Sequence, residues 1–159
     1  MKKILLYYKK IEIIGEPEFA NYIVKVLKFM NKKIPSRLKT IQKYINRIEQ
    51  SSKTCQAHLN ELSICYMSAK TAYYSTTWCA GSLVHEAHHA KLHLEYLKNN
   101  KTKIQRLLKV PRKISAMQKE ELECIKQKLI ACKKMNAPKK EIDCLKKADG
   151  LHFLKKQTW

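Results

Sequence analysis

The sequence predicts an α+β protein that is mostly helical and carries one small β-sheet. Several segments repeat apolar residues at helical spacing, and two shorter segments carry the branched and aromatic residues typical of strands. The chain of 159 residues has only three glycines and four prolines, so few positions interrupt these elements. A chain of this length buries one sizeable core. We therefore expect a single domain over 1–159, with an N-terminal part at 1–50 and the main core at 57–148.

The N-terminal part is expected to contain a strand and two helices. Residues 4–14 favour one short strand, with a helical start as the alternative. Apolar residues return at helical spacing from Glu18 to Met30. Ser36 is a suitable N-cap for a second helix, whose apolar stripe runs from Leu38 to Ile48.

The main core is expected to begin with a sheet and to continue with three helices. Within residues 58–75, the segments "LSICYMS" and "TAYYST" predict two or three strands. The strongest helical pattern follows over Trp78–Lys98, with Thr76 or Thr77 as its cap and a regular apolar stripe. Further helices are expected at about 114–135 and 138–148, the second ended by Gly150. The stripe of the strongest helix consists of Leu83, Ala87, Ala90, Leu94 and Leu97.

Net charge is the most unusual global property. The chain has 33 Lys and Arg against 13 Asp and Glu, a formal charge of +20. Such an excess attracts nucleic acid, anionic membrane surfaces and acidic proteins, although no compact RNA-recognition signature is present. We recognise neither a signal peptide nor an apolar run that could span a membrane, and expect a cytoplasmic protein. The six cysteines form no C-x-x-C pair, so reduced thiols are expected.

A histidine-rich segment, "GSLVHEAHHAKLH", lies inside the strongest predicted helix. Residues 85–89 within it match the pattern H-E-x-x-H. On a helix, His85 and His89 are one turn apart on the same face, so both imidazoles can bind one cation. Glu86 lies beside them, where its carboxylate can reach a metal-bound water. The segment therefore predicts a catalytic site with one Zn²⁺ per chain.

A third ligand is expected from a later helix, because catalytic zinc takes three protein ligands and one water. The longer pattern H-E-x-x-H-x-x-G-x-x-H is absent, and His93 lies a further turn along the helix. In the helix expected at 114–135, Glu121 falls on the apolar face, whereas Glu120 and Glu123 point away from it. A buried carboxylate is costly unless it is paired or binds metal. Glu121 is thus the predicted third ligand, with an ordinary buried salt bridge as the alternative.

These residues resemble the gluzincin metallopeptidases, and especially their small single-domain members, the minigluzincin type. "ELEC" is similar to the group's E-x-x-A, with Glu121 as the ligand and Cys124 as the small residue. Ile125 departs from the pattern, because a polar residue usually stands there to support a ligand histidine. The resemblance covers about Ala57–Ala148. It implies a zincin-like fold, in which a small sheet lies beside an active-site helix and a downstream helix carries the glutamate.

The resemblance also implies an activity, the hydrolysis of peptide bonds by a metal-activated water with Glu86 as general base. A sheet edge at "TAYYST" would bind an extended peptide as an added strand, which makes Tyr73 and Tyr74 candidate substrate-binding residues. Tyr73, Tyr74, His88 and His93 are candidate donors to the oxyanion. The positive charge would favour an acidic peptide or protein substrate. The alternative is a basic, non-enzymatic protein that binds nucleic acid or an anionic surface, with a structural metal or none.

Overall fold

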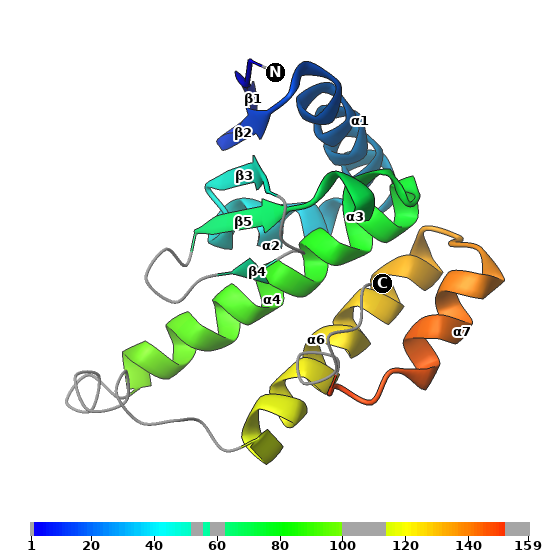
Figure 1. Cartoon of the computed structure of the whole chain (residues 1–159). Helices are drawn as coiled ribbons and strands as arrows, with labels where there is room; N and C mark the ends of the chain where they lie inside the picture. The colour runs from blue at the N-terminus through cyan, green and yellow to red at the C-terminus, as the bar shows by residue number, and fades with distance from the viewer. Residues whose placement is uncertain (1, 52–55, 58–62, 100–113, 152–159) are drawn as a thin grey trace.

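The computed structural model describes residues 2–51, 56–57, 63–99 and 114–151 (Figure 1). Helices dominate, and a small mixed sheet lies towards the N-terminal end of the fold. The predicted α+β, mostly helical class is therefore confirmed. The described helices include none that is both long and apolar enough to cross a membrane.

The sheet has the strand order β1-β2-β3-β5-β4. β1 pairs antiparallel with β2, whereas β2, β3 and β5 run parallel to one another. β4 is a two-residue edge strand that pairs antiparallel with β5. The bounds are β1 Ile4–Tyr8, β2 Ile11–Gly15, β3 Arg47–Gln50, β4 Gln56–Ala57 and β5 Ile64–Met67.

The prediction of a single strand over residues 4–14 is wrong, because this segment forms the β1–β2 hairpin. The chain reverses at Lys9, whose φ of 56° lies in the left-handed region. Neither glycine nor asparagine occupies the turn, so the usual hairpin signal is missing from the sequence. Strand-forming residues on both sides of Lys9 therefore look like one continuous strand.

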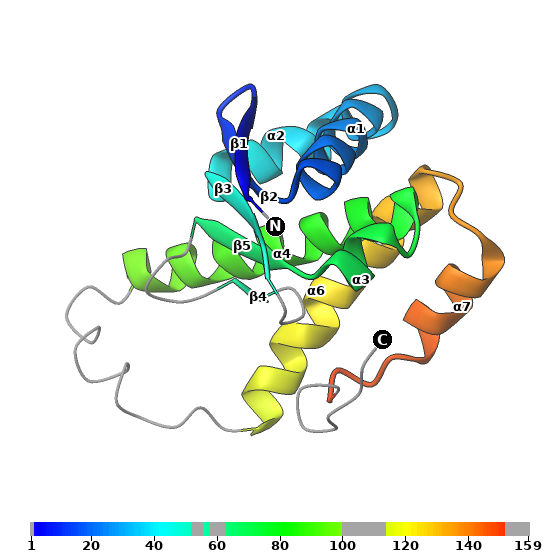
Figure 2. The ribbon, with the colours of Figure 1, turned by 45° about the horizontal axis from the view of Figure 1, so that its top comes forward.

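Two helices connect β2 to β3 and lie on the same side of the sheet (Figure 2). These are α1, Pro17–Lys33, and α2, Pro35–Tyr44, and each has proline in its first turn. The predicted cap Ser36 is wrong, because α2 already begins at Pro35. Ile48 is buried as expected, but it belongs to strand β3.

The segment "TAYYST" is not a strand, which corrects the predicted sheet edge. Its first residues belong to helix α3, Ala69–Tyr73, where the Ser68 hydroxyl accepts a hydrogen bond of 3.1 Å from the Thr71 amide. Helix α4, Thr76–Asn99, follows almost at once. Its first turn is capped by Ser75, whose hydroxyl accepts from the Trp78 amide at 2.9 Å, and not by Thr76 or Thr77.

Helix α6, Ile114–Lys134, packs along α4, and α7, Lys139–Lys147, folds back against this pair (Figure 1). α7 is anchored by Glu141, which is only 3% exposed. The Glu141 carboxylate accepts hydrogen bonds from Ser75 at 2.6 Å and Thr77 at 2.8 Å, at the N-terminus of α4. Gly150 has the expected positive φ of 69°, but α7 ends before it, with Ala148 as the C-cap.

One hydrophobic cluster joins the sheet to the helices. It draws side chains from β2, α1, α2, β3, β5 and α4 and extends to α6 and α7. Leu83, Ala87 and Ala90 of the predicted α4 stripe are all buried. The described cysteines form no disulfide with one another; four of them are buried and Cys144 is partly exposed. This core fixes α4 against both the sheet and α6.

Candidate metal centre

Packing of α4 against α6 brings together the three predicted metal ligands. The Nε2 atoms of His85 and His89 lie 3.1 Å apart. The Glu121 carboxylate oxygens lie 3.3 Å from His85 Nε2 and 3.0 Å from His89 Nε2. One donor atom from each residue falls within 4.8 Å of the others, so the group could hold a metal ion.

The spacing of these donor atoms fits a zinc ion. Zn²⁺ bonds nitrogen and oxygen at about 2.0–2.1 Å, so neighbouring ligand atoms of a tetrahedral site are separated by about 3.3 Å. The two Nε2 atoms are 3.1 Å apart, and they lie 3.3 and 3.0 Å from two different oxygens of Glu121, Oε2 for His85 and Oε1 for His89, so the group is about the size of such a site. Two imidazoles and one carboxylate are also a donor set that catalytic zinc uses.

The histidines and the carboxylates of the site shift one another's pKa. Burial by itself would lower the pKa of His89, but hydrogen bonds to Cys124, Glu120 and Glu121 raise that pKa to about 12. Burial would raise the pKa of Glu121, but its bonds to His85 and His89 hold that pKa well below its usual range. Without metal, a proton on His89 thus supplies the positive charge that a bound cation would supply.

Glu120 is part of the site, which corrects the prediction that it points away. Its carboxylate accepts a hydrogen bond of 2.9 Å from His89 Nδ1 and lies 3.6 Å from His93 Nδ1. The Glu120 side chain is only 13% exposed. A proton held on Nδ1 leaves Nε2 of the same ring free to bind metal. Glu120 therefore fixes the orientation of the His89 ring.

Ile125 is 8% exposed and packs in the core, so it offers no polar support to the ligand histidines. Glu120, the residue before Glu121, supplies such support through its hydrogen bond to His89. Cys124 is fully buried and hydrogen-bonded to His89. Burial raises the pKa of the Cys124 thiol, although the contact with His89 opposes the shift. The residue is therefore a neutral neighbour of the ligand.

Glu86 follows His85 on α4 and is 5% exposed. Within the described chain, no hydrogen bond or ion pair involves its carboxylate. The oxygens of Glu86 are not among the buried side-chain atoms that lack a hydrogen-bond partner in the described chain. Its catalytic role stays a prediction.

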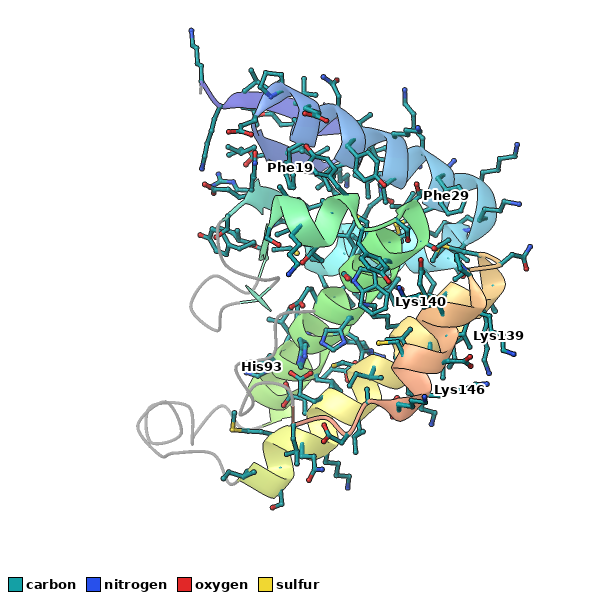
Figure 3. All side chains as sticks on the ribbon, turned by 45° about the vertical axis from the view of Figure 1, so that its right-hand side comes forward. Phe19, Phe29, His93, Lys139, Lys140 and Lys146 are labelled. Carbon is teal, nitrogen blue, oxygen red and sulfur yellow. The ribbon has the colours of Figure 1, made fainter. Side chains whose placement is uncertain are left out.

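The other candidate residues lie around this centre. His88 Nε2 is buried without a hydrogen-bond partner in the described part of the chain, and the Glu123 carboxylate lies 4.0 Å from it. Burial lowers the pKa of His88. Tyr73 packs on Tyr22 and Tyr74 on Trp78, each with ring centroids 5.3 Å apart. Their roles in substrate binding stay predictions, and His93 contacts the site through Glu120 (Figure 3).

Lys128 is a further buried residue of α6 that the apolar pattern of the sequence does not indicate. Its ammonium group donates to the Ser82 hydroxyl at 3.0 Å and lies 3.5 Å from the centroid of the Trp78 ring. This buried contact joins α4 to α6. The sequence gives one sign that this lysine lies at the interface. Lys128 follows Glu121 by seven residues, about two helical turns, so the two residues share a face of the helix.

The sheet edge beside α4 is β4. This strand contacts α4, and on its outer side no further strand follows in the described sheet. The edge predicted at residues 71–76 is therefore replaced by one at Gln56–Ala57.

Comparisons with protein-family models, with curated proteins and with solved structures give no match for this chain.

Proposed function

We propose that this protein is a small zinc-dependent peptidase of the gluzincin type. The observation that carries the proposal is the convergence of two imidazole nitrogens and a carboxylate oxygen from α4 and α6, at separations that suit tetrahedral zinc. His85, His89 and Glu121 would hold one Zn²⁺ per chain. An ordinary buried salt bridge accounts less well for two histidines that both direct Nε2 at the same carboxylate.

The chain's own residues account for the steps of hydrolysis. Bound zinc would supply Lewis acidity, which lowers the pKa of water and polarises a carbonyl. Glu86 would take the proton of the attacking water and pass it to the leaving amine. Glu120 would keep His89 in the tautomer that binds metal through Nε2. Hydrolysis of an amide through these residues requires no further cofactor.

An extended peptide is the substrate that suits the edge strand. The outer side of β4 can pair with the backbone of a peptide, because edge strands leave N–H and C=O groups open. β4 contacts α4, the helix that carries both histidines, so a peptide paired with β4 would lie beside that helix. Backbone pairing does not read side chains, so the surface charge, which favours acidic peptides, would contribute selectivity.

Metal content and a single substitution test the proposal together. We expect the purified protein to bind one zinc per chain and to cleave a fluorogenic peptide library. Glu86→Gln should retain zinc and lose at least ~100-fold of the activity, because general-base catalysis contributes that much or more. The matched control is Glu95→Gln, which removes an exposed carboxylate from the same helix.

Two results would contradict the proposal. One is a protein that takes up no zinc when metal is supplied. The other is a Glu86→Gln variant as active as the parent chain.

A further inference from the structure

Basic residues are separated from acidic ones along the N-terminal third of the chain. Residues 19–48 contain no Asp or Glu, although the flanking segments contain both signs of charge. Within this stretch the positive residues are Lys25, Lys28, Lys32, Lys33, Arg37, Lys39, Lys43 and Arg47. This stretch covers most of α1 and all of α2 and ends inside β3.

Five of these lysines are exposed, three on α1 and two on α2, and we call them together the α1–α2 basic face. Successive lysines on each helix are three or four residues apart, so they lie on one side of it at spacings of about 4.5–6 Å along the axis. Both helices lie on the same side of the sheet (Figure 2). The face consists of Lys25, Lys28 and Lys32 on α1 and Lys39 and Lys43 on α2.

The charge of this face is not neutralised within the described chain. None of its five lysines forms an ion pair there. Elsewhere lysines do have carboxylate neighbours, for example Lys126 with Glu123 and Lys146 with Asp143, both at 3.9 Å. Like charges that gather without counterions raise the positive potential of a surface and favour an anionic partner.

The partner that suits this face is a polyanion held by charge alone. The large hydrophobic side chains that the structure exposes lie outside α1 and α2, at Leu5, Tyr7, Tyr73, Tyr74, Ile114 and Leu122. Protein interfaces rely on aromatic or aliphatic anchors, and helices bound to membrane surfaces insert apolar side chains. A nucleic acid backbone needs neither, because phosphate contacts alone give affinity.

We propose that the α1–α2 basic face binds the phosphodiester backbone of a nucleic acid without sequence preference. The face lacks exposed aromatic rings for base stacking, so phosphates are its only plausible contacts on a nucleic acid. Because the lysines lie on α1 and α2, the bound strand need not cover β4 or the metal ligands of α4 and α6. The proposal does not depend on the peptidase activity.

Fluorescence anisotropy with the full-length chain and a labelled DNA duplex of mixed sequence tests this proposal. We expect the logarithm of the binding constant to fall linearly with the logarithm of the salt concentration. Replacing the five lysines of the face by Gln should weaken binding at fixed salt by at least ~10-fold and reduce the salt slope by about 3–5, since each phosphate contact adds about 0.9.

The matched control removes the same charge elsewhere. Replacing Lys133, Lys134, Lys139, Lys140 and Lys147 by Gln also takes away five exposed positive charges, from the end of α6 and from α7. These helices lie on a different part of the surface (Figures 1 and 3). We expect the control to lose less than ~3-fold in affinity. Circular dichroism of both variants checks that they are folded.

Three outcomes would overturn the proposal: an equal loss of affinity in the two folded variants, no binding of the parent chain, or tighter binding of polyglutamate than of the duplex. The last outcome would point to an acidic protein as the partner. Glu86→Gln should leave duplex binding unchanged, so this experiment and the peptidase experiment can fail separately.

Discussion

His89 has a different partner on each ring nitrogen. Nδ1 donates to Glu120 at 2.9 Å, and Nε2 lies between Glu121 and His85. The two nitrogens of an imidazole are coupled, because a proton fixed on one leaves the lone pair on the other. Glu120 would therefore act on a metal bound at Nε2 through the tautomer of His89.

Glu120→Gln should weaken zinc binding by about 10- to 100-fold, the usual effect of losing a carboxylate that supports a ligand histidine. Zinc affinity can be measured by competition with a chromophoric chelator. Glu123→Gln removes a neighbouring carboxylate that is 41% exposed and should have little effect. Equal affinity of the two variants for zinc would show that Glu120 does not position the ligand.

Cys132 should react slowly with alkylating reagents. Burial raises the pKa of its thiol to about 11, so the thiol stays protonated at pH 8. The pKa of this thiol is near 9 in the unfolded chain, so its protonated form stabilises the folded state at pH values below about 9. This contribution to the free energy of unfolding is lost as the pH rises from about 9 to about 11. Mass spectrometry after timed iodoacetamide treatment should find the partly exposed Cys144 labelled first. Equal rates at the two cysteines would contradict this.

At the residue scale, the relative positions of side chains on one helix could be predicted. Contacts between side chains of two different helices could not. The separation of His85 and His89 by one turn follows directly from helical geometry. The inward phase of Glu121 was also visible, since α6 is regular. Glu120 was placed wrongly because the phase of α6 does not tell how far His89 and His93 extend from α4.

At the scale of elements, α4 and α6 are in close contact at Gly81. A Cβ atom added there would lie 2.7 Å from Cys132 Sγ and 3.1 Å from Lys128 Cγ. The helices can approach this closely only because residue 81 has no side chain. This contact lies one turn before His85 and so sets the separation of the helices that carry the metal ligands.

Gly81→Ala should destabilise the protein by about 1–2 kcal/mol. Overpacking a core costs about 1–3 kcal/mol, which exceeds the gain of up to ~1 kcal/mol from the higher helix propensity of alanine. Urea denaturation measures the change. In a Cys132→Ala background the nearest obstacle is gone, and the same substitution should cost much less. Additive effects of the two substitutions would show that the residues are not coupled.

Secondary structure was predictable where one pattern dominated a long segment. The ranges of α1, α4 and α6 differ from expectation by few residues. Errors fell on short elements. α3 has five residues, and its branched and aromatic composition suggested a strand, whereas the Ser68 cap and the packing of Tyr73 on Tyr22 stabilise a helix.

At the scale of the whole molecule, the order of the strands could not be predicted. β2, β3 and β5 are parallel neighbours, although α1 and α2 separate the first two along the chain. Such pairings depend on contacts between distant residues, which periodicity within a segment does not report. The mixed sheet, and the position of β4 at its edge, were therefore available only from the structure.

Removing zinc should lower the melting temperature without unfolding the protein. A ligand that binds only the folded state stabilises it by about 2.7 kcal/mol at 100 times its dissociation constant. The hydrophobic cluster does not include the metal ligands, so it should hold the fold when zinc is absent. Calorimetry with and without a chelator should show a decrease that added zinc reverses and that His89→Ala abolishes. An unchanged melting temperature in the parent chain would contradict the zinc site.

The third ligand, on α6, has a consequence for the protein during its synthesis. α4 carries both histidines and leaves the ribosome first, whereas Glu121 follows only after the segment that joins α4 to α6. All three donors are therefore present only after Glu121 has left the ribosome. A nascent chain would thus carry the lysines of the α1–α2 basic face before it could hold zinc, and the proposed peptidase activity would begin only after that point.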